Sequence, residues 1–234
     1  FANEGARAML VKREGEQSDF ASIITDAGGT THVTVFQGAA LKAEDVAPFA
    51  DEIASAKVLV LDNEIPEDVY VAAAEIASAH GVKIILNPAP YIPVPDGLFD
   101  GVDYVTPNET EAEQFTGVKV DTVEDCRLAA GKFFEMGVKN VIITLGIRGA
   151  FFTDGEREIL VPAIKVKAVE TTGAGDAFNG GLATAIAEGL PMETALRFAT
   201  CTSAISVSRL GSSLSMPYRH EIAALMEKEF GVTL

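Results

Sequence analysis

The sequence has few of the features that mark disulfide-rich, metal-binding, nucleic-acid-binding or membrane-spanning proteins. Its two cysteines, Cys126 and Cys201, lie far apart without metal-ligand spacing, which predicts two buried free thiols. It has 18 Lys and Arg against 34 Asp and Glu, a net charge of −16, and no basic block, which argues against a nucleic-acid partner. The longest apolar runs, such as 58–61, are too short to cross a bilayer. No targeting segment is recognised, so we expect no membrane association and a cytoplasmic location.

Apolar residues make up 48% of the 234 residues, enough for one large core. From about residue 44, short apolar runs alternate with longer segments of helical periodicity. This alternation predicts βαβ units, and hence an α/β fold with a doubly wound, mostly parallel sheet and helices on both faces. The expected strands are 58–61, 84–86, 104–106, 141–144 and 164–169, the expected hairpin joins 150–153 to 159–161, and the expected helices are 66–80, 121–136, 176–188, 192–208 and 217–229.

The first part of the chain has a different, β-rich character. Residues 20–25 and 31–36 are strand-like, and Asp26-Ala27-Gly28-Gly29 between them predicts the turn of a β-hairpin. We therefore predict a β-rich lid segment over 1–43 and an α/β nucleotide-binding body over 44–234. Because an open two-stranded ribbon with apolar side chains needs a cover, we expect a homodimer through this segment.

The most informative stretch of the sequence is 170–181, Glu-Thr-Thr-Gly-Ala-Gly-Asp-Ala-Phe-Asn-Gly-Gly. It follows the expected strand 164–169 and opens an expected helix. Three small residues, 173–175, allow a tight turn whose N–H groups and helix dipole would bind an anion. Asp176, in the first helical turn, would then accept a proton from an attacking hydroxyl. The alternative is a plain strand-to-helix turn with Asp176 as a cap.

Two other nucleotide-binding motifs are excluded by spacing. Gly131-Lys132 is followed by Phe133, so there is no G-x-x-x-x-G-K-[ST] loop, and 173–175 lacks the third glycine of a dinucleotide fingerprint. Instead, Gly-Ala-Gly-Asp at 173–176, with the Phe and Gly that follow at 178 and 180, resembles the signature of the ribokinase-like (PfkB) carbohydrate kinases. Three more segments match in the family's order: Leu86-Asn87-Pro88-Ala89-Pro90, the N-x-x-E of Asn108 and Glu111 in 106–113, and Thr144-Leu145-Gly146-Ile147-Arg148-Gly149.

The segments around Asn87 and Asn108 are most similar to the ribokinase branch of this family. The resemblance implies an ATP-dependent kinase for a pentose, with ribose at its 5-hydroxyl as the leading choice. A kinase for another sugar, a sugar acid or a nucleoside is the alternative within the family. A non-catalytic nucleotide-binding module is the alternative outside it, although such a module would have no need of a base at Asp176.

The resemblance also implies a role for each matching residue. Asp176 would be the base and a sugar contact, and Glu64 a further sugar contact, with a solvated loop acid as the alternative for Glu64. Mg²⁺ would be held through water by Glu111; without the resemblance, Asn108 and Glu111 are a helix cap with a capping box. The anion hole would be Gly173, Ala174 and Gly175, and the nucleotide contacts Asn108, Thr144, Gly146, Arg148 and Thr200. A K⁺ site would include Glu170, Thr172, Ser206, Arg209, Gly211 and Ser215, where Glu170 departs from the family's Asp.

One family motif has no match in the sequence. The resemblance implies a Gly-Gly-x-Gly-x-Asn sugar-binding motif in an N-terminal portion, and no such motif occurs. Gly28-Gly29 falls in the expected hairpin turn and Gly180-Gly181 in an expected helix. The nucleotide half of the site is therefore represented and the sugar half is not, so we expect an N-terminal portion to be missing from the sequence.

Overall fold

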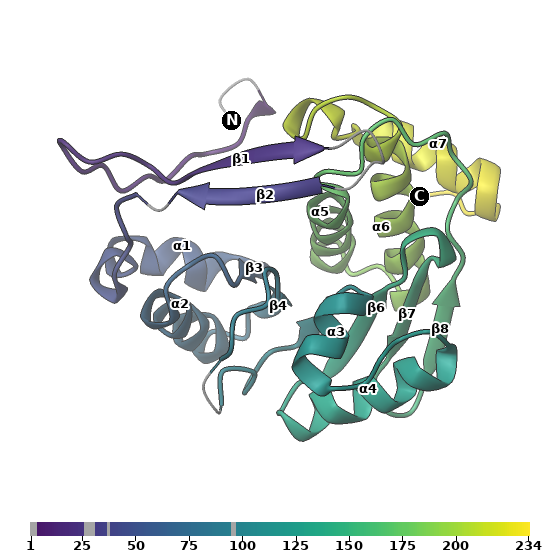
Figure 1. Ribbon diagram of the computed structural model, residues 1–234, viewed down its shortest axis with the longest axis horizontal. Helices are drawn as coiled ribbons and strands as arrows, with labels where there is room; N and C mark the ends of the chain where they lie inside the picture. The colour runs from purple at the N-terminus through teal and green to yellow at the C-terminus, as the bar shows by residue number, and fades with distance from the viewer. Residues whose placement is uncertain (1–3, 26–30, 37, 95–96) are drawn as a thin grey trace.

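The structure, a computed structural model, describes residues 4–25, 31–36, 38–94 and 97–234, and is built on a six-stranded sheet with a separate two-stranded ribbon (Figure 1). The six strands lie side by side in chain order, the first four parallel and the last two antiparallel. The result confirms the predicted mostly parallel α/β fold. The strands are β3 (Val58–Asp62), β4 (Lys83–Asn87), β5 (Tyr104–Val105), β6 (Asn140–Thr144), β7 (Ala150–Thr153) and β8 (Glu158–Val161).

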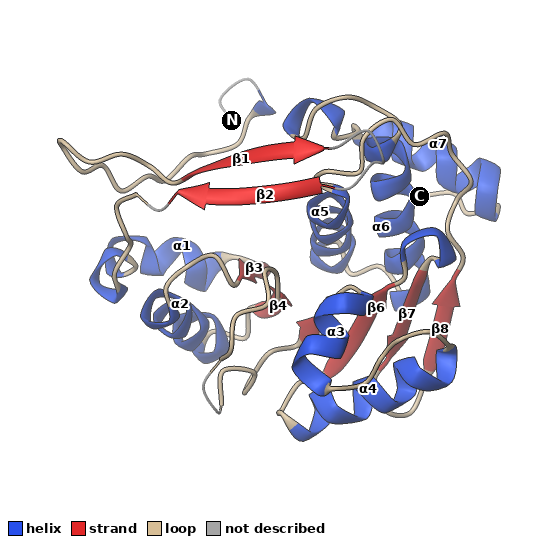
Figure 2. Cartoon of the chain, viewed as in Figure 1, coloured by secondary structure: helices blue, strands red, loops and turns tan. Residues whose placement is uncertain are grey.

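Helices cover both faces of this sheet (Figure 2). On one face lie α2 (Glu67–Ala79), α3 (Glu109–Thr116) and α4 (Val123–Glu135), and on the other α5 (Ala174–Ala187), α6 (Met192–Val207) and α7 (Arg219–Phe230). Helix α1 (Ala50–Ser55) packs on α2. Short 3₁₀ turns complete the fold at η2 (Ala43–Asp45), η3 (Ala47–Phe49), η4 (Gly146–Arg148) and η5 (Ser213–Ser215).

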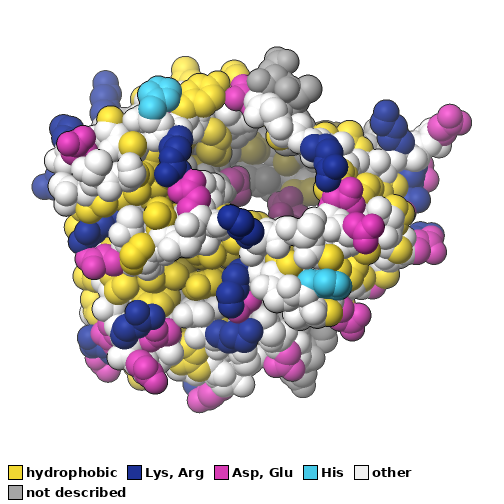
Figure 3. Space-filling view, turned by 180° about the vertical axis from the view of Figure 1, so that it is seen from behind, with side chains coloured by type: hydrophobic (Ala, Val, Ile, Leu, Met, Phe, Trp, Pro, Cys, Tyr) yellow, Lys and Arg dark blue, Asp and Glu magenta, His cyan; other side chains and the backbone are white. Residues whose placement is uncertain are grey.

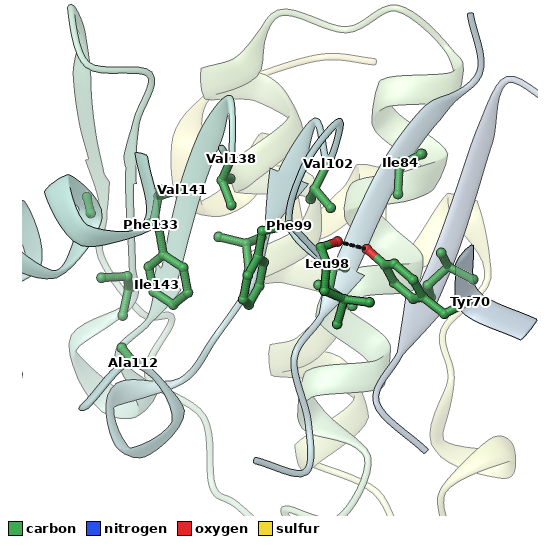
Figure 4. Packing of buried hydrophobic residues seen from close by; sticks show 14 of the residues in the cluster. Tyr70, Ile84, Leu98, Phe99, Val102, Ala112, Phe133, Val138, Val141 and Ile143 are labelled. Carbon is green, nitrogen blue, oxygen red and sulfur yellow. Dashed lines mark hydrogen bonds between the residues drawn. The ribbon is translucent and has the colours of Figure 1, made fainter. Parts of the chain in front are cut away.

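Two buried cores follow from the alternation of side chains along the strands. Ile84 and Leu86 of β4 point into the first core, while Ile85 between them points into the second. Figure 4 shows part of the first core, where the Tyr70 hydroxyl donates to the Leu98 carbonyl at 3.1 Å. Because both faces of the strands are buried, they read as continuous apolar runs in the sequence.

Both cysteines are buried and free, as the sequence predicts. Cys126 lies in the first core and Cys201 in the second. Burial raises the pKa of Cys201 to about 12, so its thiol is protonated and unreactive at neutral pH. None of the helices in the described part of the chain is long and apolar enough to cross a membrane.

The expected strand 164–169 is wrong. Side chains from Lys165 to Val169 are exposed and no strand forms there, because the segment crosses the surface without a neighbouring strand to pair with. Its end is held by a helix instead: the N–H groups of Val169 and Glu170 donate to the Val207 carbonyl at 2.8 and 3.2 Å. The C-terminal end of α6 therefore positions the motif that follows.

The two-stranded ribbon confirms the predicted hairpin, in which β1 (Phe20–Thr25) pairs antiparallel with β2 (Thr31–Phe36). The predicted turn at 26–29 lies outside the described residues. Phe20 stacks on Phe36 with ring centroids 4.5 Å apart, and both rings are about half exposed, at 55% and 47%. At the base of the ribbon, Ala39 N–H donates to the Gln17 carbonyl at 2.9 Å, and the Asp19 carboxylate accepts from Gly38 N–H.

Candidate active site

The glycine-rich motif forms the N-terminal end of α5. Gly173 precedes the helix with φ of 79°, a left-handed conformation that favours glycine. The first N–H groups of any helix have no partner within it, and the helix dipole adds partial positive charge there. A Cβ added at Gly175 would meet no atom within 4 Å, so the space beside this residue is open. The Ala174 N–H already donates to the Thr171 carbonyl at 3.1 Å, and binding of an anion at this turn stays a prediction.

Asp176 lies exposed in the first turn of α5, beside the glycine turn. A Cβ added at Gly173 would lie 3.7 Å from the Asp176 Oδ2 atom, which places the carboxylate beside the glycine turn. Asn179, near the start of α5, is hydrogen-bonded to Thr106, directly after β5, at 2.8 Å, so the N-terminal end of α5 lies at the edge where the parallel strands end. Open α/β sheets bind ligands at this edge.

Glu64 follows the carboxyl end of β3, within range of the charge of Asp176. The loop after β3 carries it, and the Asp62 carboxylate accepts its N–H at 3.0 Å. Desolvation raises the pKa of Glu64, and the negative charges of Asp62, Asp176 and Asp19 raise it further. The base of the ribbon, through Asp19, and the first turn of α5, through Asp176, therefore both lie within electrostatic reach of Glu64. Figure 3 shows a hollow on the reverse face, with both acidic and basic side chains on its rim.

Asn108 and Glu111 form a capping box at the start of α3. The Glu111 carboxylate accepts from the Asn108 N–H and from its side-chain amide, and Asn108 Oδ1 accepts from Glu111 N–H, all at 2.8 Å. Burial raises the pKa of Glu111, while the two hydrogen bonds from Asn108 oppose this shift. The structure therefore contains the capping box that the spacing of Asn108 and Glu111 indicates. A role toward nucleotide or Mg²⁺ stays a prediction.

The loop after β6 lies beside Asn108, because Asn108 and Thr144 form an isolated parallel bridge. Thr144 N–H also donates to the Pro107 carbonyl at 2.9 Å. Gly146 begins η4, at the end of which the Arg148 guanidinium turns toward the α3–α4 connection. There it donates to the Val120 carbonyl at 3.0 Å and pairs with Glu109 at 3.2 Å. A nucleotide contact by Arg148 stays a prediction.

Thr200 lies on α6, with its hydroxyl buried and without a hydrogen-bond partner among the described residues. Buried hydroxyls are nearly always hydrogen-bonded. A bound ligand or water would satisfy this one, which is compatible with the predicted nucleotide contact.

The residues predicted for K⁺ come together where the 208–215 loop meets the start of the motif. The Glu170 carboxylate accepts from Gly211 N–H at 2.8 Å, and the Ser206 and Ser215 hydroxyls are 2.8 Å apart. Arg209 N–H donates to the Ser206 carbonyl at 3.0 Å. Thr172 follows Glu170 by two residues, and a Cβ at Gly173 would come within 3.6 Å of the Ser212 Cβ. The cluster therefore borders the anion loop.

Sequence reasoning missed two polar residues that contact the first turn of α5 and a third that contacts one of them. Ser203 on α6 donates to the Ala174 carbonyl at 3.1 Å, and Asn179 donates through its amide to the Gly175 carbonyl at 3.1 Å. Thr106, just after β5, donates to the Asn179 Oδ1 atom at 2.8 Å. The available signal was limited to Asn179, a polar residue among the small and apolar residues of 177–182.

Comparison with known proteins shows the family to which the chain belongs. The pfkB family carbohydrate kinases match residues 3–219, so the chain belongs to that family. It is 40% identical over 176 residues to a ribokinase of Haemophilus influenzae, covering 75% of this chain and 58% of the relative. A ribokinase of Staphylococcus aureus is 34% identical over 218 residues, with 92% and 72% covered.

A solved structure of Arabidopsis thaliana ribokinase complexed with ribose and ATP has a similar fold. The TM-score is 0.83 at 30% identity, and the match covers 91% of this chain and 70% of that one. The chain thus spans about three fifths to three quarters of the length of these relatives.

Proposed function

We propose that this protein transfers the γ-phosphoryl group of ATP to a hydroxyl of a pentose, with ribose to ribose 5-phosphate as the reaction. The observation that carries the proposal is the placement of Asp176 in the first turn of α5, beside the open space at Gly175 and within electrostatic reach of Glu64. The relatives named ribokinase, and the ribokinase structure with ribose and ATP, support the choice of substrates.

In this mechanism Asp176 accepts the proton of the sugar 5-hydroxyl as its oxygen bonds to the γ-phosphorus. The bond from that phosphorus to the β–γ bridging oxygen breaks, and ADP leaves with the electron pair. Backbone N–H groups of 173–175 stabilise the charge on the transferring group. Glu64 orients the sugar, and Asn108, Thr144, Gly146, Arg148 and Thr200 hold the nucleotide.

Mg²⁺ would arrive with the nucleotide. The described residues contain no group of three or more His, Cys, Asp and Glu side chains able to hold a metal, which fits an ion carried mainly by phosphate oxygens and water. Glu111 fits a water-mediated contact, because its carboxylate is held in place by Asn108 and keeps further acceptor capacity. The ion would neutralise phosphate charge.

K⁺ would be held by Glu170 with carbonyl groups of the 208–215 loop, and would set the field of the anion loop. One Glu170 oxygen accepts from Gly211 N–H, and the other remains available for a cation. We expect K⁺ to raise the rate of phosphoryl transfer. The protein should bind K⁺ more weakly than the Glu170→Asp variant does, because the longer side chain of Glu170 shifts its oxygen by one methylene. The measurement is the rate against K⁺ and Na⁺ at fixed ionic strength. Equal rates with and without either cation would contradict a K⁺ site.

The remaining proposals concern the whole molecule. We propose that 1–43 acts as a lid over the 44–234 body and that two copies associate through β1 and β2, whose exposed Phe20, Ile24 and Phe36 side chains need a cover. Free buried thiols fit a reducing compartment and support a cytoplasmic location.

The proposed association through β1 and β2 predicts a dimer in sedimentation, and a monomer for the double variant Phe20→Ser/Phe36→Ser. A wild-type monomer at high protein concentration would contradict this interface.

The proposed reaction is tested by ADP formation with a panel of pentoses, hexoses, sugar acids and nucleosides, using the protein in its full natural length. Ribose should give the highest kcat/KM. An equal or higher kcat/KM for another acceptor would contradict the assignment of ribose as the preferred substrate. ADP formation independent of any acceptor would refute sugar phosphorylation.

A further inference from the structure

A buried polar link joins the carboxyl edge of the sheet to the catalytic end of α5. Thr106 Oγ1 donates to Asn179 Oδ1 at 2.8 Å, and Asn179 Nδ2 donates to the Gly175 carbonyl at 3.1 Å. Thr106 is 2% exposed and Asn179 4%. Both polar groups of the Asn179 amide are therefore used, one toward the sheet and one toward the residue that precedes Asp176.

The sheet end of this link is firmly held. Thr106 N–H donates to the Leu86 carbonyl at the end of β4, at 3.0 Å, and the next residue, Pro107, accepts from Thr144 N–H at 2.9 Å. Thr106 is thus fixed by backbone hydrogen bonds to the strand on either side of β5. Its hydroxyl links this edge of the sheet to α5 through the hydrogen bond to Asn179.

The helix end of the link lies where the proposed chemistry occurs. Asn179 is three residues after Asp176, so the two side chains lie on neighbouring parts of the helix surface. A displacement of about 1 Å in a reacting group costs on the order of 100-fold in rate. Directional hydrogen bonds between the sheet edge and α5 add to apolar packing in fixing the rotation of the helix about its axis.

A purely structural role would not require these residue types. Asn is a poor helix former, because its side chain competes for backbone groups. Replacing both partners of a buried hydrogen bond by apolar groups of similar shape is often nearly neutral for stability. Stability alone therefore does not require a polar pair one turn from Asp176.

We propose that Thr106 and Asn179 are positioning residues, which set the orientation of the first turn of α5 and so place Asp176 and the anion-binding N–H groups for phosphoryl transfer. The inference rests on the proposed kinase function. It adds a requirement that the sheet edge carrying Asn108 and Thr144 and the helix carrying Asp176 keep one fixed relation during the reaction.

The test uses Thr106→Val, which is close in shape but has no hydroxyl, with Thr106→Ser as the matched control that keeps it. Thr106→Val should lower kcat about 10-fold and change KM for ATP less than threefold, and Thr106→Ser should retain kcat near wild type. The double variant Thr106→Val/Asn179→Leu, with both partners apolar, should recover thermal stability but not kcat. A wild-type kcat in Thr106→Val, or in the double variant, would overturn the proposal.

A second readout does not depend on activity. Amide hydrogen exchange over 174–179 should be faster in Thr106→Val than in wild type or Thr106→Ser, because the first turn of α5 loses its anchor. Unchanged exchange would overturn the link, whatever the kinetics. If the unsubstituted protein formed no ADP with any acceptor, the proposed function would fail, and the exchange result would still decide the link.

Discussion

Asp176→Asn is expected to lower turnover about 10²–10⁴-fold, the usual contribution of a positioned general base, while nearly preserving ATP binding. The substituted amide has almost the same shape, so the first turn of α5 and the open space beside Gly175 should persist. It cannot take up the hydroxyl proton, however, so the attacking oxygen stays a poor nucleophile. The measurement is single-turnover phosphoryl transfer together with ATP affinity by calorimetry.

Asp51→Asn provides a matched control for this substitution. Asp51 also lies in the first turn of a helix, α1, and is exposed, so its replacement removes the same charge near a helix N-terminus away from the site. The control should turn over like wild type. Unchanged turnover in Asp176→Asn would remove this residue from the chemistry, and a parallel loss of folding stability would make it a helix cap.

Local patterns in the sequence predicted the elements of the fold well. Continuous apolar runs such as 84–86 and 141–144 are strands buried on both faces, and the alternation with helical segments predicted a parallel sheet. The same reasoning failed for 164–169, where an alternating apolar pattern has no neighbouring strand. Whether such a segment pairs depends on tertiary partners that a local pattern does not contain.

Some features of the candidate site could likewise be predicted from the sequence, and others could not. The glycine turn before Asp176 and the capping box of Asn108 with Glu111 are fixed by short-range spacing, so they were predictable. The partners of Arg148 and Glu170 lie 27–39 and 41 residues away in sequence, and only folding brings them together. Thr106 and Asn179, 73 residues apart, were missed for that reason.

Gly175→Val is expected to weaken ATP binding at least about 100-fold and to lower kcat/KM correspondingly. A Cβ at this position meets no protein atom within 4 Å, and no positive φ requires glycine there, so the fold should tolerate the side chain. The branched side chain would instead fill the space in which we place the phosphoryl group. Loss of one or two charge-assisted hydrogen bonds, at about 1.5–3 kcal/mol each, accounts for the size of the effect.

Gly180→Val separates obstruction of the site from a general effect of valine in α5. A Cβ at Gly180 likewise meets nothing within 4 Å, and this residue is exposed about one turn beyond Asp176. Both variants should unfold at a temperature close to that of wild type, since valine has a higher helix propensity than glycine. Only Gly175→Val should lose ATP binding in calorimetry. Wild-type affinity in Gly175→Val would show that the anion does not approach this turn, and equal losses in both variants would trace the effect to the helix rather than to the open space.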